Sequence, residues 1–584
     1  MERQVYEFIF TQTGEKILTR KTCPDCGQEF AITDKDLEFY SKISPVFNGT
    51  KYEIPAPTLC PDCRQQRRLA RRNERKLYKR KCDLSWKDMI SVYSRDSDYK
   101  VYDQKEWRSD KRNPLDYGRD FDFTKTFWKQ IDELIKDVPC IGLYSWLEME
   151  NCHYCNYGNQ CKNSYLSINC YLQENALYCK WCSSSEWLWY NNVDCTENND
   201  DCVEVYQSQK LKHCTKVFFS YNSDFCENCR YCYDCTNCKN CVWCTNLKNK
   251  QYYIFNQEVS KEYFEEFTKD ITQKVNTPGF LKEIKDFLSN RIVKQYRLYN
   301  SQDCIWDDLI NCNKCYLCFL MLSSENCKYA YESWWFSKYI VDGMEAWDFS
   351  EYLYESMMAH KNYKCWFFIN SNSCKDSYYC KDCFNSSDLF GCVWLKHKQY
   401  CILNKQYTKE EYEVLVPKII EYMQKTWERW EFFSASISPF GYNETVANED
   451  YLLSRDESIA RWYKRMDKEY PINVPEGIEL VRAQDLSDNI HDIPDEILKK
   501  AIVCEVSWKP FRIVKPELDF YRKHNLSLPR KHPDVRHLER LSKRAPRNLY
   551  LRTCDNCGKQ VISVYPADSE FKVYCEECYN KQVY

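Results

Sequence analysis

The stretch CENCRYCYDCTNCKNCVWC, from Cys226 to Cys244, places a cysteine at every third position. An α-helix does not bring residues three, nine and eighteen apart onto one face without also favouring a spacing of four. A polyproline helix has a three-residue repeat, but the sequence has no proline between residues 140 and 277 or between 279 and 416. Exclusion of proline is typical of stacked strands, in which every backbone amide is needed. The pattern therefore predicts short strands wound in laps.

The middle of the chain is duplicated. CTNLKNKQYYIFNQEVSKEYFEEF, starting at Cys244, aligns without a gap with CVWLKHKQYCILNKQYTKEEYEVL, starting at Cys392. We expect one Cys- and Asn-rich β-solenoid in residues 140–300 and another in 301–432. Each is expected to close with a helix, opened by Ser260 in the first copy and by Thr408 in the second. Thr408 and Glu411 have the spacing of a capping box.

Cysteine suits the narrow interior of such a coil because it is small and readily buried. Asparagine can form ladders between laps and can occupy left-handed backbone positions. Two alternatives stay open, a metal–thiolate cluster and a set of disulfides, and the first is compatible with a coil. The chain carries no secretory signal pattern, so we expect a cytoplasmic protein, in which the 38 cysteines stay reduced. The number of residues per lap is not fixed by the sequence.

The two ends of the chain are copies of each other. Residues 23–102 align with residues 504–574, which predicts zinc modules at 1–125 and 491–584, with a linker at 433–490. Each copy has four positions for a CxxC turn and fills two of them. Two CxxC turns supply the four thiolates that structural zinc requires. The expected ligands of about two structural Zn²⁺ ions per chain are Cys23, Cys26, Cys60, Cys63, Cys554, Cys557, Cys575 and Cys578.

Two details of the modules carry expectations of their own. Between the CxxC pairs of the second copy, KQVISVY and FKVY are expected to pair as a two-stranded hairpin. Cys82, Cys504 and His532 occupy otherwise incomplete positions. They are remnants of lost sites or the ligands of a further, imperfect one.

A strongly basic segment follows Cys63. RQQRRLARRNERKLYKRK, residues 64–81, has no Gly or Pro and is expected to be a helix. Clustered arginines next to a zinc turn favour binding to the phosphate backbone of nucleic acid, with RNA preferred over DNA. The expected contacts are Arg64, Arg67, Arg68, Arg71, Arg72, Arg75, Lys76, Lys79, Arg80, Arg536, Arg540, Arg544 and Arg547.

The alternative is that these cations pair within the chain or with a protein. The formal net charge of −3 gives no overall attraction to nucleic acid, and Asp132, Glu133 and the acidic residues 194–204 offer a counter-surface. Only 12 glycines occur, and no phosphate-binding loop, nucleophile elbow or HExxH motif is present. No apolar stretch is long enough to span a membrane. We therefore expect a non-enzymatic protein.

Several segments resemble a group of uncharacterised cysteine-rich zinc-ribbon proteins of small-genome, candidate-phylum bacteria. They are CPDCRQQRRLARRNERKLYKRKCDLS, SPFGYNETVANEDY, IHDIPDEILKKAIVCE and DFYRKHNLSLPRKHPDVRH. The chain departs from that pattern at Ser85 and Trp86, which replace part of a CxxC turn, and at 328–364, where cysteines are lost. The resemblance implies a cytoplasmic, zinc-binding protein and no particular activity.

Three functions follow from these features. The first is a mixed α+β protein that binds RNA or the ribosome through its arginine-rich segments. The second is a protein-interaction scaffold that uses its solenoid faces and purely structural zinc. The third is a metal–thiolate storage protein, which would hold many more than two metal ions.

Overall fold

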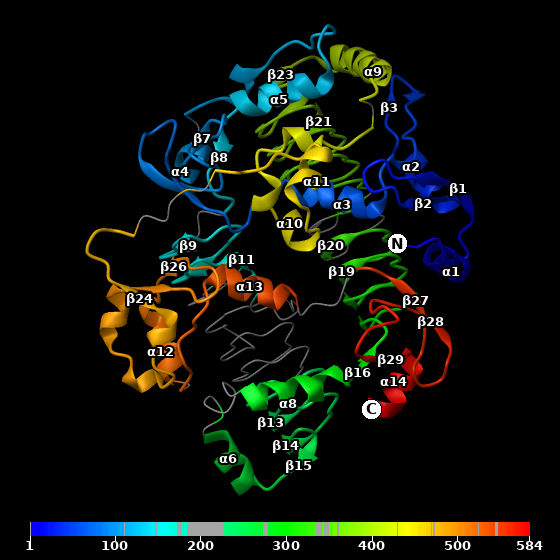
Figure 1. Ribbon diagram of the computed structural model, residues 1–584. Helices are drawn as coiled ribbons and strands as arrows, with labels where there is room; N and C mark the ends of the chain where they lie inside the picture. The colour runs from blue at the N-terminus through cyan, green and yellow to red at the C-terminus, as the bar shows by residue number, and fades with distance from the viewer. Residues whose placement is uncertain are drawn as a thin grey trace.

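The computed structural model in Figure 1 covers the chain from residue 2 to residue 583. It does not describe residues 110, 146–148, 172–177, 179, 184–225, 270, 272–277, 335–340, 344–349, 352, 359–360, 429, 469, 471–473, 524 and 543–546.

The first cysteine-rich stretch forms parallel ladders whose partners lie twelve residues apart. Glu227 pairs with Lys239, and Lys239 pairs in turn with Gln251. The strands here are β9 (Met149–Glu150), β10 (Cys161–Lys162), β11 (Ile168–Tyr171), β12 (Lys180–Ser183), β13 (Lys239–Val242), β14 (Gln251–Ile254) and β15 (Gln257–Glu258).

The second cysteine-rich stretch is built in the same way, with offsets of eleven to thirteen residues. Isolated parallel bridges such as Tyr363 with Lys375 continue the ladder between its strands. The strands are β17 (Leu298–Tyr299), β18 (Leu309–Ile310), β19 (Phe319–Leu322), β20 (Tyr331–Trp334), β21 (Ser387–Phe390), β22 (Gln399–Ile402) and β23 (Lys405–Gln406).

A three-residue unit repeats along the parallel pairings of both cysteine-rich stretches, which are called the first and the second ladder below. One residue makes the bridge, the next has positive φ, as at Asn228 (50°) and Tyr231 (56°), and the third is an inward cysteine. The Sγ of Cys232 donates to the carbonyl of Cys241, 3.5 Å away on the next lap. Asparagines twelve residues apart are in contact, since Asn228 Nδ2 donates to Asn240 Oδ1 at 2.7 Å. The cysteines are therefore stacked, buried thiols.

In fold class the protein is mixed α/β, with a tetracysteine cluster near each end. The finer expectation of two solenoids is not established at this level, because the laps contribute only strands of two to four residues and single bridges. The expected closing helices are present. They are α6 (Lys261–Lys269) and α9 (Lys409–Lys425), and α8 (Pro278–Ser289) is a further helix. Thr408 and Glu411 form the expected capping box at the start of α9, and Ser260 Oγ accepts from the amide of Tyr263 at the start of α6.

The terminal modules contain four copies of one hairpin, each turning at a position where a CxxC pair begins. The hairpins are β1 (Ile17–Thr22) with β2 (Glu29–Thr33), β5 (Tyr78–Lys81) with β6 (Asp88–Ser91), β25 (Ala501–Val503) with β26 (Pro510–Phe511), and β27 (Tyr550–Thr553) with β28 (Gln560–Ser563). In every copy the amide of the fourth residue after the cysteine donates to the cysteine carbonyl, at 2.9–3.1 Å. The structure thus repeats the duplication seen in the sequence.

A short helix follows each hairpin later in the chain, beginning at the position of the second CxxC pair. The four are α3 (Pro61–Leu69), α4 (Gln104–Arg108), α13 (Pro533–Leu541) and α14 (Glu576–Val583). The helix expected over 64–81 is therefore too long, because residues 78–81 belong to strand β5. The hairpin expected from KQVISVY and FKVY is also wrong. Strand β28 pairs with β27, while β29 (Lys572–Tyr574) pairs in parallel with β16 (Ile292–Lys294) of the middle region.

Further elements complete the modules. They are α1 (Arg3–Thr13), α2 (Asp34–Ile43), β3 (Val46–Phe47), β4 (Thr50–Lys51), β7 (Val101–Tyr102), α5 (Phe127–Asp137), β8 (Cys140–Ile141), β24 (Leu480–Arg482) and α12 (Lys515–Lys523), with short 3₁₀ turns between them. None of the helices in the described part of the chain is both long and apolar enough to cross a membrane.

Residues 433–490 differ from the expected linker. Phe433, Phe440 and Tyr442 are buried, and the segment forms α10 (Val446–Asp450) and α11 (Arg455–Ala460). The amide of Val446 donates to the carbonyl of Arg72 at 3.0 Å. In Figure 1, α3 lies near the centre of the molecule, close to α10 and α11 and alongside the second ladder. This segment therefore helps to enclose α3.

Candidate metal centres and the arginine-rich helix

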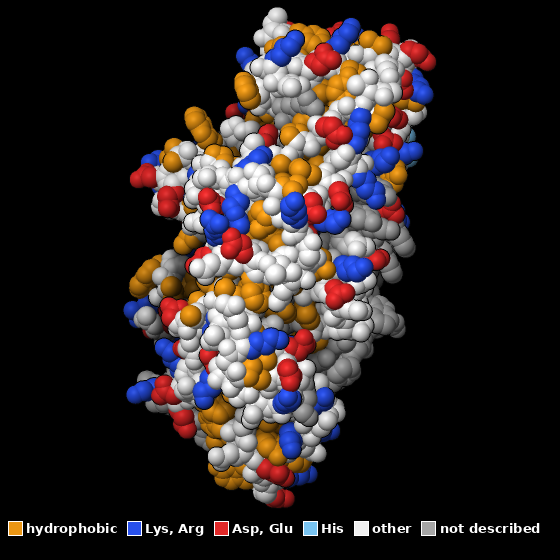
Figure 2. Space-filling view, turned by 90° about the vertical axis from the view of Figure 1, so that its right-hand side faces the viewer, with side chains coloured by type: hydrophobic (Ala, Val, Ile, Leu, Met, Phe, Trp, Pro, Cys, Tyr) orange, Lys and Arg blue, Asp and Glu red, His pale blue; other side chains and the backbone are white. Residues whose placement is uncertain are grey.

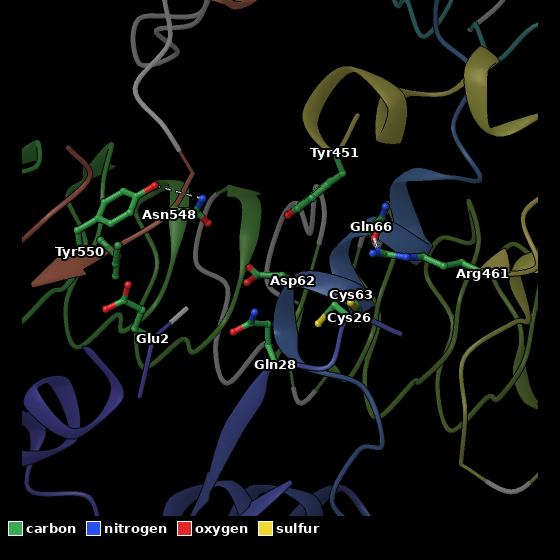
Figure 3. A pocket seen from close by; sticks show the side chains of 11 residues that line it. Glu2, Cys26, Gln28, Asp62, Cys63, Gln66, Tyr451, Arg461, Asn548 and Tyr550 are labelled. Carbon is green, nitrogen blue, oxygen red and sulfur yellow. Dashed lines mark hydrogen bonds between the residues drawn. The ribbon is translucent and has the colours of Figure 1, made fainter. Parts of the chain in front are cut away.

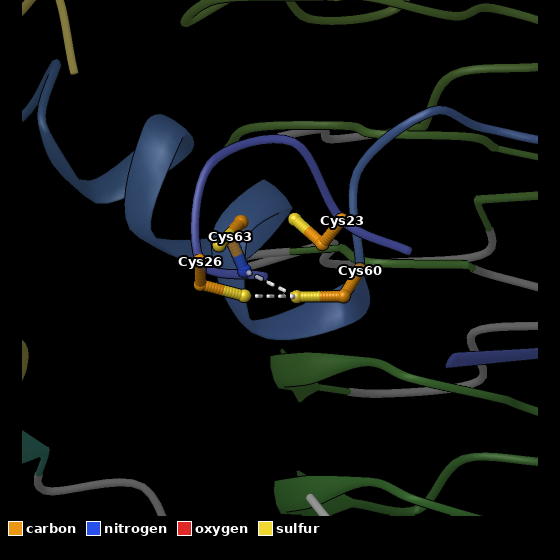
Figure 4. A group of neighbouring side chains, drawn as sticks. All are labelled: Cys23, Cys26, Cys60 and Cys63. Carbon is orange, nitrogen blue, oxygen red and sulfur yellow. Dashed lines mark hydrogen bonds between the residues drawn. The ribbon is translucent and has the colours of Figure 1, made fainter. Parts of the chain in front are cut away.

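The first cluster joins a hairpin turn to a helix N-terminus (Figure 4). Cys23 and Cys26 lie in the turn between β1 and β2, where Gly27 has φ 72°. Cys60 is the N-cap residue of α3, and its sulfur accepts from the amide of Cys63 at 3.4 Å. Proline at the next position has the fixed φ that starts a helix. The four sulfurs lie within 4.8 Å of one another.

The second cluster repeats this arrangement near the C-terminus. Cys554 and Cys557 lie in the β27–β28 turn, and Cys575 and Cys578 begin helix α14. Gly558 has φ 72°, like its counterpart in the first turn. Cys557 is exposed, whereas the other three cysteines are buried. All eight residues expected to ligate zinc are thus brought together in two groups of four.

Both clusters fit tetrahedral zinc. Zn–S bonds of about 2.3 Å place sulfurs about 3.8 Å apart, and the sulfurs of Cys26 and Cys60 lie 3.7 Å apart and those of Cys557 and Cys575 3.9 Å apart. Burial opposes ionisation of Cys554, but amide donors from neighbouring residues lower the pKa of its thiol to about 6. A low pKa supplies the thiolate that zinc binds. The two tetracysteine clusters are consistent with two structural Zn²⁺ ions.

A cavity of about 380 Å³ lies beside the first cluster (Figure 3). Its lining includes Cys26, Cys63 and Asp62, and burial raises the pKa of that carboxyl group. Arg461 Nη1 donates to Gln66 Oε1 at 3.2 Å across the same cavity. The cluster itself supplies four sulfur ligands, so a zinc ion here has a complete ligand set without a group from the cavity.

Cys82, Cys504 and His532, at the incomplete CxxC positions, accept hydrogen bonds from backbone amides. Cys82 Sγ accepts from the amide of Asp103 at 3.3 Å, and Cys504 Sγ accepts from two amides of its own turn. His532 Nδ1 accepts from the amide of Asp534 at 3.1 Å and thereby caps α13. Among the described residues, none of the three belongs to a group that could hold a metal ion. This placement favours remnants over a further site.

The arginines of α3 are buried, not exposed. Arg64 and Arg68 both pair with Asp342, which has no solvent-exposed side-chain surface. Arg67 Nη2 donates to both carboxylate oxygens of Glu355 at 2.8 Å. Both carboxylates come from the second cysteine-rich stretch. In this conformation α3 therefore binds the protein's own acidic residues and does not present its arginines on the surface; nucleic-acid binding by them stays a prediction.

The other expected nucleic-acid contacts are mostly enclosed as well. Buried side chains include Arg71, Arg72, Arg80, Arg536 and Arg540. Arg75 and Lys76 pair with Asp534, at 3.7 and 3.4 Å, and Arg547 pairs with Asp450. Lys79 is exposed. Arg544 and the acidic residues 194–204 lie outside the described residues. On the face shown in Figure 2, basic and acidic side chains are interspersed.

The sequence analysis missed the acidic partners. Asp342 and Glu355 lie in residues 328–364, where cysteines are absent. Both have positive φ, 62° and 45°, and so occupy the left-handed position of the three-residue unit. An acidic residue at that position within a cysteine-poor part of the ladder is the one signal that could have identified them. Burial raises the pKa of Glu355, although Arg67, Arg68 and Arg64 oppose this shift.

Comparisons with known proteins identify only the first module. Residues 19–72 match a family model described as a probable treble clef domain. The matched residues include the hairpin turn with Cys23 and Cys26 and the helix N-terminus with Cys60 and Cys63. The first module is thus a probable treble clef zinc domain, and no named family is shown for the whole chain. No curated protein matches the chain.

One solved structure shows a weak likeness. It is from Desulfovibrio desulfuricans G20 and was provisionally assigned as an acetyltransferase, with 8% identity over 45% of this chain and 70% of that one. The TM-score is 0.09, so this likeness carries no argument about fold or function.

Proposed function

We propose that this is a non-enzymatic protein-interaction scaffold in which zinc has a purely structural role. The observation that carries the proposal is the buried pairing of Arg64, Arg67 and Arg68 with Asp342 and Glu355. Cys60 and Cys63 hold the first turn of the same helix. The metal thus fixes a helix whose positive charges are paired inside the molecule. Its arginines form a clamp, in the sense that their ion pairs hold the first module against the second ladder.

The ligand sets support a structural role for zinc. Catalytic zinc keeps a position open for water or substrate, whereas both clusters here consist of four cysteines. The hairpin turns and helix N-termini that supply the sulfurs occur twice with the same geometry. Zinc in these positions holds two short elements together.

We also propose that the two cysteine-rich stretches are coils with laps of about twelve residues and that their outer faces bind protein partners. Parallel bridges at that offset support the coil. Stacked aromatic rings, such as Tyr231 and the buried Trp243 at 5.1 Å, support a regular spacing along the coil. Such repeats give extended, rigid surfaces suited to docking.

Metal storage is less well supported than scaffolding. Burial raises the pKa of the Cys365 and Cys392 thiols, which keeps them protonated. Their sulfurs donate to the carbonyls of Cys374 and Cys401, both at 3.3 Å. A protonated thiol that is already hydrogen-bonded to the backbone is a poor metal ligand. Among the described residues, only the two terminal clusters form groups that could hold a metal ion, and the proposal limits zinc to them.

RNA or ribosome binding through α3 would require the helix to leave Asp342 and Glu355. Crosslinking in cells distinguishes that state from the scaffold. We expect amine-reactive crosslinks to partner proteins at exposed ladder lysines such as Lys375, and fewer at Lys35 of α2, which serves as the matched control. In parallel, ultraviolet crosslinking should leave the peptide 61–72 free of RNA. RNA adducts on that peptide, or protein crosslinks spread equally over both lysines, would overturn the proposal.

A further inference from the structure

Two hairpin turns that have lost their second cysteine carry an exposed tryptophan. Trp86 follows Ser85 in one turn, and Trp508 follows Ser507 in the other. The two tryptophans are 71% and 69% exposed. Both have positive φ, 59° and 57°, at the place where the intact turns have glycine. The same sequence, Ser-Trp-Lys, therefore sits at the tip of both metal-free turns.

The two turns are not counterparts in the internal duplication. Trp86 aligns with Gly558, and Trp508 aligns with Gly27. In each aligned pair, one copy keeps Cys-Gly and the other has Ser-Trp. The replacement therefore occurs at two different positions of the repeated module, so copying one altered turn along with its module does not account for it. A functional requirement shared by both turn tips accounts for the repeated replacement.

The tryptophans bring no evident benefit to the fold. A left-handed backbone conformation brings the Cβ of a residue too close to the following carbonyl oxygen, a strain that glycine avoids. Within the described part of the chain, neither indole ring has an aromatic or cationic partner, and neither covers the remaining cysteine of its turn, since most of its surface is exposed. Trp427 and Trp462 are also exposed at positive φ, so what sets Trp86 and Trp508 apart is the Ser-Trp-Lys sequence repeated in two hairpin turns.

The chemistry next to the rings indicates the partner. Lys87 and Lys509 follow the tryptophans directly, are exposed, and have no ion-pair partner among the residues that the structure describes. A flat π surface next to a cation suits an unpaired base and its phosphate, because the base stacks and the ammonium group neutralises charge. We infer that the Trp86 and Trp508 tips each bind single-stranded RNA, at sites distinct from the buried arginine helix and beyond the scaffold role.

The test uses the full-length, zinc-loaded protein and a fluorescein-labelled, mixed-sequence single-stranded RNA 20-mer, followed by fluorescence anisotropy. The W86G/W508G variant should bind roughly tenfold more weakly for each ring lost, and it should melt at the same temperature as wild type or higher because the backbone strain is relieved. W427G is the matched control, because Trp427 is 93% exposed and also has positive φ, 61°, but lies at the end of α9. It should bind like wild type.

A second variant, K87E/K509E, leaves the rings in place and should weaken binding and reduce its dependence on salt. The inference fails if wild type does not bind the RNA, or if W86G/W508G binds as well as W427G. It also fails if wild type binds phosphatidylcholine vesicles through these rings and not RNA. These results are separate from the scaffold proposal, whose failure would appear as RNA adducts on the peptide 61–72.

Discussion

At the scale of single residues, the most consequential feature is one buried carboxylate shared by two arginines. Asp342 is fully enclosed and contacts both Arg64 and Arg68. Removing one partner of a buried ion pair leaves charge without compensation in a medium of low polarity. The aspartate therefore matters more to stability than any exposed acidic residue.

We predict that Asp342→Ala lowers the free energy of unfolding by about 3–5 kcal/mol, because it strands two buried guanidinium groups. Denaturant unfolding followed by circular dichroism measures this change. Asp88→Ala is the control, since Asp88 is 90% exposed in its pair with Lys81, and it should change the stability by less than about 0.5 kcal/mol. Equal effects in the two variants would contradict the assigned role of Asp342.

A second residue predicts a response to acid. Burial opposes ionisation of Asp534, but Lys76 and Arg75 lower the pKa of its carboxyl group to about 2. In the unfolded chain the pKa of an aspartate is about 3.9. Because the folded pKa is the lower one, the stabilisation is complete above about pH 4 and is lost as the pH falls towards 2.

Asp534→Asn should therefore melt at a lower temperature than wild type near pH 6 and show a shallower loss of stability between pH 5 and pH 2. Thermal melts across this range measure both effects. Asp519→Asn removes an exposed carboxylate that pairs with Lys515, and it should keep the wild-type profile. A profile for Asp534→Asn as steep as that of wild type would show that another group controls the acid response.

The sequence predicted residues well where their partners are near in the chain or repeat a known spacing. All eight zinc ligands follow from CxxC pairs, since two cysteines in one tight turn point at one ion. The arginines were misjudged because their partners are distant: Arg64 and Asp342 are 278 residues apart. A run of cations looks exposed unless the folded chain supplies the opposing charges.

At the scale of elements, zinc and helix α3 act as one unit. Cys60 caps the helix and Cys63 lies in its first turn, while the arginines that reach the second ladder follow directly. A short helix is marginal without tertiary contacts or a cap. Loss of the first metal should therefore free the arginines of α3 from the second ladder, whereas the second metal holds α14.

We predict that Cys63→Ala and Cys578→Ala each reduce the bound zinc from two ions to one per chain, but with different effects on the rest of the molecule. Cys63→Ala should lower the unfolding free energy by about 3–5 kcal/mol or more, because the buried ion pairs are lost with the metal. It should also speed hydrogen exchange in residues 61–69. Cys578→Ala should leave exchange in those residues unchanged, and equal exchange in both variants would contradict the coupling.

Elements were predictable where the pattern was local and unpredictable where pairing was distant. The α9 capping box follows from Thr408 and Glu411, three residues apart. Strand β29 has its pattern in the sequence, but its partner β16 lies 280 residues earlier. Alternation identifies a strand without naming the strand beside it.

At the scale of the whole molecule, the largest core joins parts that are remote in sequence. Tyr40 of the first module packs against Tyr354 of the second ladder, with ring centroids 5.1 Å apart. Trp366 of that ladder packs against Trp430, at 5.0 Å. The ladder therefore serves as the surface on which the N-terminal module and residues 430–463 assemble.

This arrangement predicts two classes of thiol. In the native, zinc-loaded protein, ladder cysteines such as Cys229 and Cys383, which have no exposed surface, should resist iodoacetamide. After chelation, Cys557 should react first because it is exposed. Mass spectrometry of tryptic peptides distinguishes the classes, and native mass spectrometry should find two zinc ions. Ladder thiols that become reactive on chelation, together with more than two metals, would instead indicate metal storage.

The twelve-residue offset also gives the ladder a regular spacing along its length. Neighbouring strands lie about 4.8 Å apart, so each lap adds one fixed increment of distance between whatever is attached at its ends. Gain or loss of twelve residues preserves the pairing of every remaining residue, whereas the offsets of eleven and thirteen in the second ladder show that single residues are accommodated locally. The length of such a ladder can therefore change by whole repeats while its columns of cysteines are kept.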